Sequence, residues 1–274
     1  MDILSLLACF QPLITRVSMR HFSLIVPALL TMTGRVTMLA ISRWTEKGGS
    51  YRTVQRFFAT ELPWTKLLVK FFRTHLCSAE DEFILAGDAT TITKSGKLTH
   101  GIGRFFRGFA RHVVSGLEFF VFSLVDVAER KAYPLCVKQT VRREAEKAAI
   151  KLRQKKRSKK SKPKPKGRPK GSLNKDKKEL NLSPELLRIN KLLSDLLKLL
   201  RIFVKIKYVA LDGHFGHHQA VLMSRKNDLH LISKMRKDTA LYEKYEGAYG
   251  GRGARKEVWK AAEIRFIADK ILEK

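Results

Sequence analysis

Residues 208–218 read YVALDGHFGHH, and this stretch decides the fold class. Four apolar or aromatic residues run directly into Asp212, which is followed by two glycines and three histidines. A short apolar run that ends in a turn signal is typical of a buried strand, and Asp-Gly is typical of a turn. The chain carries 55 Lys and Arg against 25 Asp and Glu, so an acid at the end of a buried strand needs an explanation.

A second apolar run, FILAGDATT (83–91), also ends in an aspartate, Asp88. Two strands and a helix are expected to follow this run along the chain. After them we expect a second helix, the strand that ends at Asp212, a short helix and a last strand near 228–235. The two strands after Asp88 are RHVVSGLEFFVFSLVDV (111–127) and KAYPLCVKQ (131–139), which we interpret as a hairpin. Three antiparallel strands followed by helix-linked strands predict an α/β layered domain, and exclude a barrel or a sandwich.

On this topology the first strand and the strand beginning near Lys207 lie side by side. Asp88 and Asp212 then share one edge of the sheet. Two carboxylates this close repel each other unless a cation lies between them, and Mg²⁺ prefers oxygen ligands. Two such ions activate water and stabilise the departing oxygen in phosphodiester hydrolysis. The alternative is that each aspartate only caps the following turn.

Residues 1–75 show apolar positions at helical spacing, with Pro and Gly at the joints. Within GGSYRTVQRFF (48–58) we expect a glycine turn, a Ser50 cap and a short helix. Arg52, Gln55 and Arg56 share its polar face, which suits a recognition helix in a major groove or an ordinary solvated face. The apolar stretch 22–41 contains Arg35, Pro27 and several hydroxyl residues, which favour a buried helix pair over a membrane span.

The formal net charge of +30 indicates a polyanionic partner, DNA or RNA. Residues 151–178 alone carry 15 Lys or Arg and one acid, which leaves +16 for the rest. This segment has few apolar side chains and is expected to be disordered. Its Gly-Arg-Pro core, with Lys166, Arg168 and Lys170, resembles an AT-hook, whose arginine lies in a narrow A·T minor groove. The alternative is a solvated arm that binds any phosphate backbone.

Three stretches together resemble the DDE transposases of bacterial insertion sequences, in the branch with a ribonuclease-H-like catalytic domain and a β-rich insertion. They are GDATTITKSGKLTHG (87–101), VALDGHFG (209–216) and LISKMRKDTALY (231–242). The resemblance implies that Asp88 and Asp212 are catalytic acids holding Mg²⁺ or Mn²⁺. It also implies hydrolysis of DNA at the element ends and attack of the freed 3′-hydroxyl on target DNA.

Cations follow Asp88 in a glycine-broken segment, KSGKLTHGIGR (94–104), which suits either phosphate contact or a basic surface loop. They are Lys94, Lys97, His100 and Arg104. The cluster His214, His217 and His218 lacks a fourth ligand, so a zinc site is disfavoured.

The resemblance requires a third acid, a glutamate in a Tyr-x2-Arg-x3-Glu-x6-Lys pattern. Tyr249 and Arg252 have the first spacing, but Lys256 occupies the glutamate position. The third acid is therefore unknown, and the expectation is a truncated transposase with impaired cleavage. The alternatives are a non-catalytic DNA-binding protein that inhibits the full enzyme, and a structural RNA-binding protein.

The expected division of the chain has five parts: 1–76, a helical DNA-binding region; 77–150 and 184–240, the two parts of the ribonuclease-H-like domain; 151–183, the basic insert; and 241–274, the start of an insertion. The expected partner is double-stranded DNA, with homodimers by analogy, and neither a membrane nor a small-molecule substrate. Three scattered cysteines show no disulfide or zinc spacing, which fits a reduced interior. The expected location is the bacterial cytoplasm, in association with the nucleoid.

Overall fold

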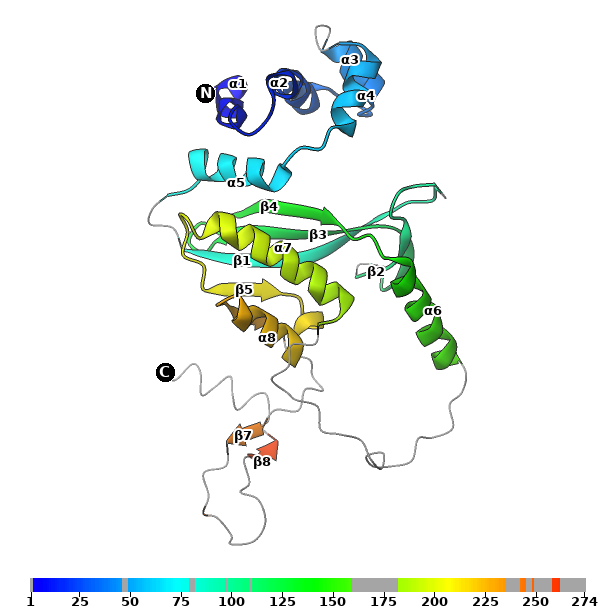
Figure 1. Ribbon diagram of the computed structural model, residues 1–274, viewed down its shortest axis with the longest axis vertical. Coiled ribbons are helices and arrows are strands. Elements are labelled where there is room, and N and C mark those ends of the chain that lie inside the picture. Colours follow the sequence, from blue (N-terminus) through cyan, green and yellow to red (C-terminus); the bar gives the residue numbers. More distant parts are fainter. Residues whose placement is uncertain are drawn as a thin grey trace.

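The structure is a computed structural model that describes residues 2–45, 49–78, 82–96, 98–108, 110–158, 182–234, 242–244, 248 and 258–261. A group of helices precedes a six-stranded mixed sheet, and the helices α7 and α8 pack on one face of that sheet (Figure 1). The predicted α/β class with a helical N-terminal region is therefore confirmed.

The main sheet has the strand order β2-β3-β1-β5-β6, and β4 also pairs with β3. The strands are β1 (Phe83–Thr93), β2 (Gly103–Arg107), β3 (His112–Asp126), β4 (Ala132–Gln139), β5 (Tyr208–Leu211) and β6 (His230–Ser233). β3 is antiparallel to β1, β2 and β4, whereas β5 is parallel to both β1 and β6. The predicted antiparallel hairpin and the predicted pairing of the two aspartate-bearing strands are both confirmed. Outside this sheet, β7 (Tyr242–Lys244) pairs with β8 (Val258–Ala261).

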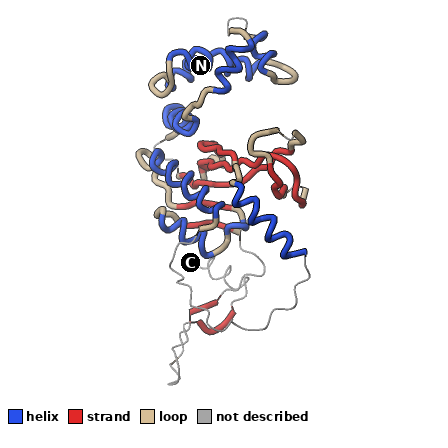
Figure 2. The backbone as a smooth tube through the Cα atoms, turned by 45° about the vertical axis from the view of Figure 1, so that its right-hand side comes forward, coloured by secondary structure: helices blue, strands red, loops and turns tan. Residues whose placement is uncertain are grey.

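Helices α7 (Pro184–Leu200) and α8 (His218–Lys226) cover one face of the sheet (Figure 2). α7 begins where the Ser183 side chain accepts a hydrogen bond from the Leu186 amide, with Pro184 in the first turn. Its leucines recur at three- and four-residue spacing, and six of its side chains are buried against the sheet. They meet the alternate residues Phe83, Leu85, Phe122 and Leu124 of β1 and β3.

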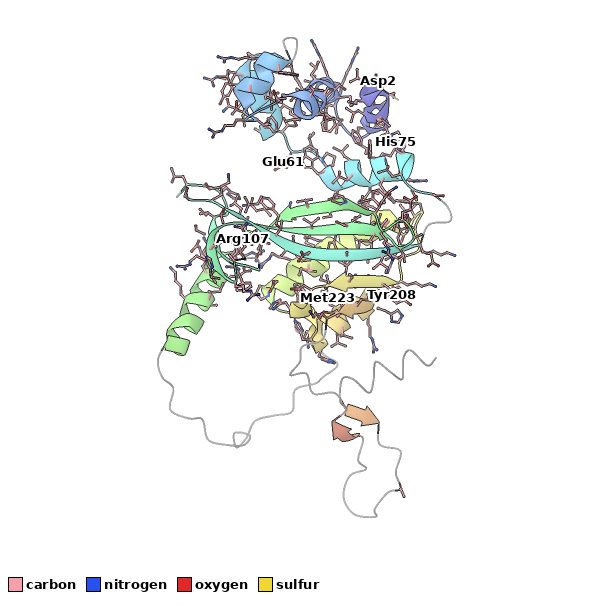
Figure 3. All side chains as sticks on the ribbon, turned by 180° about the vertical axis from the view of Figure 1, so that it is seen from behind. Asp2, Glu61, His75, Arg107, Tyr208 and Met223 are labelled. Carbon is pink, nitrogen blue, oxygen red and sulfur yellow. The ribbon has the colours of Figure 1, made fainter. Side chains whose placement is uncertain are left out.

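The other residues of each strand point to the opposite face of the sheet, which we call the open face. Ile84, Ala86, Val121 and Val125 are only partly buried there, and Tyr208 of β5 is 42% exposed. Figure 3 looks onto this face and shows the strands in front of the helices. The two faces therefore differ: one holds the core, and the other is accessible.

The described part of the N-terminal region holds a short 3-10 helix (Ala8–Phe10) and five α-helices: α1 (Ile3–Leu7), α2 (Arg16–Thr31), α3 (Met38–Trp44), α4 (Tyr51–Ala59) and α5 (Trp64–His75). α5 is buried on two sides. Its Leu67 and Phe71 pack in the helical core, whereas Val69 and Phe72 pack in the core of the sheet. α5 therefore belongs to both cores and lies between the helical group and β4 (Figure 1).

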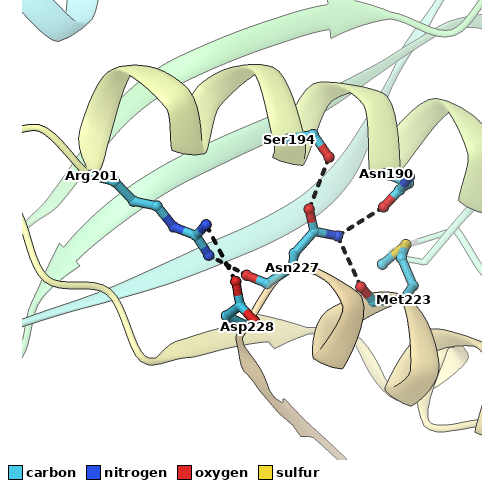
Figure 4. Close-up of polar contacts among 6 residues, drawn as sticks. All are labelled: Asn190, Ser194, Arg201, Met223, Asn227 and Asp228. Carbon is cyan, nitrogen blue, oxygen red and sulfur yellow. Dashed lines mark hydrogen bonds and ion pairs between the residues drawn. The ribbon is translucent and has the colours of Figure 1, made fainter.

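Asn227 ties the turn before β6 to α7 (Figure 4). Its side-chain amide donates to the Asn190 Oδ1 at 2.8 Å, and its Oδ1 accepts from the Ser194 hydroxyl at 2.8 Å. Arg201 donates to the Asn227 carbonyl and forms an ion pair with Asp228 at 3.6 Å. Asp228 has a φ of 55°, a conformation that this network holds in place. The position of β6 is thereby fixed by the helix on which the core is built.

α6 (Glu144–Ser158) leads from β4 toward the basic insert. Residues 159–181 of the insert, including Lys166, Arg168 and Lys170, lie outside the described residues. The two flanks of the insert are joined, because Arg188 of α7 donates to both carboxylate oxygens of Glu146 at 2.8 Å. None of the helices in the described ranges combines the length and the apolar composition that a membrane span needs.

Candidate active site

The pairing of β1 with β5 brings Asp88 and Asp212 together. The parallel register aligns Leu85 with Val209 and Gly87 with Leu211, and each aspartate is the next residue along the chain. Asp212 directly follows the end of β5, as expected, whereas Asp88 lies inside β1, which continues to Thr93 because its pairing with β3 extends that far. Neighbouring strands lie about 4.8 Å apart, so the two backbones are in adjacent positions. The structure thus places side by side two acids that are 124 positions apart in the sequence.

Both aspartates point to the open face of the sheet. Gly87 and Leu211, which precede them, are buried on the helix-covered face, and side chains alternate along a strand. The two carboxylates are accordingly exposed. Each Oδ1 accepts a hydrogen bond from the next backbone amide, at 2.7 Å from Ala89 and at 2.6 Å from Gly213.

Gly87 is a glycine because the core leaves no room for a side chain there. A Cβ at this position would lie 2.8 Å from both Leu211 Cδ2 and Phe122 Cε1, and 3.1 Å from Phe120 Cζ. The residue before one catalytic candidate is thus packed directly against the residue before the other. This contact sets the relative position of the middle of β1 and the end of β5.

The turn after Asp212 is held by β6. The Ser233 hydroxyl donates to the Asp212 carbonyl at 3.0 Å. A Cβ on Gly213 or Gly216 would come within 3.0 Å or 3.2 Å of the Lys234 carbonyl oxygen, so the turn lies close to the end of β6. The residues that anchor Asp212 were not predicted from the sequence, because the contact spans 21 positions and Ser233 carries no motif.

Asp88 and Asp212 suit a divalent cation with oxygen ligands. Mg²⁺ is commonly bound by one or two carboxylates, with water and substrate phosphate completing its coordination, and an exposed pair leaves room for both. Across the parts of the chain that the structure describes, no group of three or more His, Cys, Asp or Glu could hold a metal ion. Of the histidine cluster, His214 lies 3.6 Å from a Glu185 carboxylate oxygen.

The three polar residues expected on a recognition helix do share one exposed side of α4. Arg52, Gln55 and Arg56 are exposed, whereas Val54 and Phe57 are buried in the helical core. The expected Ser50 cap is wrong in one respect. Ser50 occupies the N-cap position, but its side chain makes no capping hydrogen bond and lies 3.4 Å from the Thr53 hydroxyl.

The segment 94–104 is not wholly a loop, because Arg104 lies in β2. Lys94 and Arg104 are both exposed, and Lys97 lies outside the described residues. The loop between β1 and β2 is tied to β4, since the Gln139 side chain donates to the His100 carbonyl at 2.9 Å. Lys94, His100 and Arg104 are therefore carried on an ordered extension of the sheet.

A cleft of about 900 Å³ lies on the helix-covered face, between the start of α5, β4 and α7, and neither aspartate lines it. Its lining includes Glu118 and Cys136. Burial raises the pKa of the Glu118 carboxyl, although a hydrogen bond from Thr140 and the charge of Arg142 oppose the shift. This cleft is separate from the carboxylate pair.

The fold is thus a mixed α/β sheet with two acids at adjacent positions, one within β1 and one directly after the parallel strand β5. The chain matches the family model of the DDE superfamily endonucleases over residues 9–264. It therefore belongs to that family, which implies a nuclease-type enzyme that acts on DNA. No curated protein and no solved structure matches the chain.

Proposed function

We propose that this protein is the DNA transposase of an insertion sequence, in which Asp88 and Asp212 hold Mg²⁺ or Mn²⁺. The single observation that carries the proposal is the β1–β5 register, which sets the two acids next to each other on one accessible face. Membership of the DDE superfamily endonucleases supports it. The net charge of +30 supports a nucleic acid substrate.

The proposed reaction has two steps. In the first, a water oxygen attacks a phosphorus atom at the element end, the bond from phosphorus to the 3′ oxygen breaks, and a 3′-hydroxyl and a 5′-phosphate remain. In the second, that 3′-hydroxyl attacks a phosphorus atom of the target DNA, the bond from this phosphorus to its 3′ oxygen breaks, and the target strand is left with a free 3′-hydroxyl. The bound ions supply Lewis-acid stabilisation of the attacking and departing oxygens. Asp88, within β1, and Asp212, directly after β5, would hold and position those ions from a rigid part of the sheet.

The remaining candidate residues are proposed to bind DNA. Arg52, Gln55 and Arg56 would contact a major groove from α4, and Lys94 and Arg104 would contact phosphates near the acids. We include in this proposal the cations outside the described residues, Lys97, Lys166, Arg168 and Lys170. A homodimer on paired ends and association with the bacterial nucleoid are further parts of the proposal.

The test uses the full chain and a duplex made from the DNA that flanks its own gene. With Mg²⁺ or Mn²⁺ we expect strand breaks that end in a 3′-hydroxyl, and loss of those breaks in Asp88→Asn and in Asp212→Asn. The matched control is Asp195→Asn, an exposed acid on α7 that pairs with Lys198. Cleavage that persists in both site variants would refute the assignment.

A second candidate function is a DNA-binding protein that does not cut. It is favoured by the finding that the described residues bring no third metal-ligating side chain to the aspartate pair. In that case the chain binds the flanking duplex but leaves it intact, and Asp88→Asn together with Asp212→Asn leaves the affinity unchanged. Competition between duplex DNA and RNA of equal length separates both candidates from an RNA-binding protein.

A further inference from the structure

The hairpin formed by β2 and β3 carries an apolar pair on its surface. Phe106 of β2 faces Val113 of β3, and these side chains are 63% and 44% exposed. Single exposed apolar residues are common in proteins. This pair is unusual because of what surrounds it and because of the face on which it lies.

The back of the hairpin is firmly held. Phe105, the neighbour of Phe106, is 1% exposed, and the Arg142 guanidinium lies 4.2 Å from the centre of its ring. Arg142 also donates to the Arg104 carbonyl at 2.7 Å. Because side chains alternate along a strand, burial of Phe105 directs Phe106 and Arg104 outward on the other side. The exposure of Phe106 is therefore a property of an ordered strand.

Phe106 and the acids share the open face. Along β3, Val113 and Val121 are an even number of residues apart, so they point the same way, and Val121 is the partner of Asp88. Eight residues at about 3.4 Å each separate Val113 from Val121 by roughly 27 Å. β5 runs from Tyr208 toward the end of the sheet where Arg107 lies (Figure 3). A single ligand lying along the open face would reach the hairpin and the carboxylates together.

The positive charge around the β2–β3 hairpin indicates that this ligand is a nucleic acid. Residues 89–117 contain five Lys or Arg and no Asp or Glu. Arg104 is exposed on the same side of β2 as Phe106. An aromatic wedge beside arginine is the combination by which proteins enter a minor groove, partly unstack a base step and bend the duplex.

We propose that Phe106, supported by Val113, inserts at a base step of duplex DNA while Arg104 contacts the adjacent phosphate. The step lies about eight base pairs from the phosphodiester at the carboxylates, since stacked bases in B-DNA rise about 3.4 Å per step along each strand. The inference rests on the proposed function and adds to it a residue that deforms the DNA. Deformation at a set distance from the cut fixes where the duplex lies on the open face.

The test places 2-aminopurine, one position at a time, along the flanking duplex and measures its fluorescence with the full chain bound in Ca²⁺, which blocks cleavage. We expect a rise at one step, roughly eight base pairs from the cut, that is lost in Phe106→Ala and kept in Phe106→Leu. Affinity should fall by roughly 5-fold to 100-fold in Phe106→Ala. The matched control is Ile202→Ala, an apolar residue that is 70% exposed in the turn after α7, which should change neither quantity.

The outcomes separate this inference from the function on which it rests. If Phe106→Ala keeps the fluorescent step and full affinity while Asp88→Asn abolishes cleavage, the insertion of Phe106 is refuted and the proposed transposase function is supported. If the unaltered chain shows no fluorescent step, the wedge is likewise refuted. If the step is present and depends on Phe106 but no cleavage occurs in Mg²⁺, the insertion of Phe106 is supported and the protein is a DNA-binding protein that does not cut.

Discussion

The packing around Gly87 makes a sharp prediction for Gly87→Ala. The new Cβ would lie 2.8 Å from atoms of Leu211 and Phe122 and 3.1 Å from Phe120. Ordinary carbon contacts lie at about 3.5–4.0 Å, so each neighbour must retreat by about 0.4–1.2 Å. All three are buried in the core of the sheet, where side chains have little room to move.

Overpacking of this kind costs about 1–3 kcal/mol. Gly87 does not have a positive φ, so alanine can adopt its backbone conformation. Alanine also lowers the conformational entropy of the unfolded chain, which stabilises the folded protein by about 0.4–1 kcal/mol. The net loss in the free energy of unfolding is about 1.5 kcal/mol, which lowers Tm by roughly 3–6 °C for a chain of this size. Circular dichroism during heating measures the shift.

The matched control is Gly108→Ala, because no atom lies within 4 Å of a Cβ there. Its Tm should change by about 1–2 °C at most, in line with the small effects of most surface substitutions. A second readout is Mn²⁺ affinity, which should weaken in Gly87→Ala because Leu211 directly precedes Asp212. If Gly87→Ala melts at or above the temperature of the unaltered chain, the packing argument is wrong.

Three further outcomes are expected. Ser233→Ala removes the hydroxyl that holds the Asp212 carbonyl, so Mn²⁺ titration should show severalfold weaker binding with a Tm change of a degree or two, and Ser233→Thr should restore it. Glu118→Gln should raise Tm at pH 8 more than at pH 4. A raised folded-state pKa means that folding favours the protonated acid, so Glu118 costs stability once pH rises through that pKa. Arg188→Met leaves Glu146 half-buried without its partner and should cost about 1–3 kcal/mol in urea unfolding; an unchanged midpoint would show that the pair contributes nothing.

The carboxylate pair could be predicted because its signal is local. Each aspartate ends a short apolar run, and the order of strands and helices alone suffices to make those runs neighbours. The register could not be predicted to the residue. It depends on how Leu211 and Phe122 close over Gly87, which is a contact among three strands.

β2 was missed for a physical reason. Its five residues lie between glycines, and its ordering depends on Arg142, which packs on Phe105 from nearly forty positions away. Strand signals in the sequence come from longer alternating runs, so a short strand that is stabilised from outside carries almost none. The Ser50 cap failed differently: the residue type was right for an N-cap, but its hydroxyl lies beside the Thr53 hydroxyl instead of a backbone amide.

The position of α5 has a consequence for the distance along the DNA between the bound sequence and the cleaved bond. Leu67 and Phe71 fix it in the helical group, and Val69 and Phe72 fix it on the sheet, so tilting one part against the other would open a core. Under the proposed function, α4 binds one DNA sequence, and another bond is cleaved at Asp88 and Asp212. These two points on the DNA are then a constant number of base pairs apart. Such a protein should cut at one fixed distance from the sequence it binds, and its cuts should not be distributed over several positions.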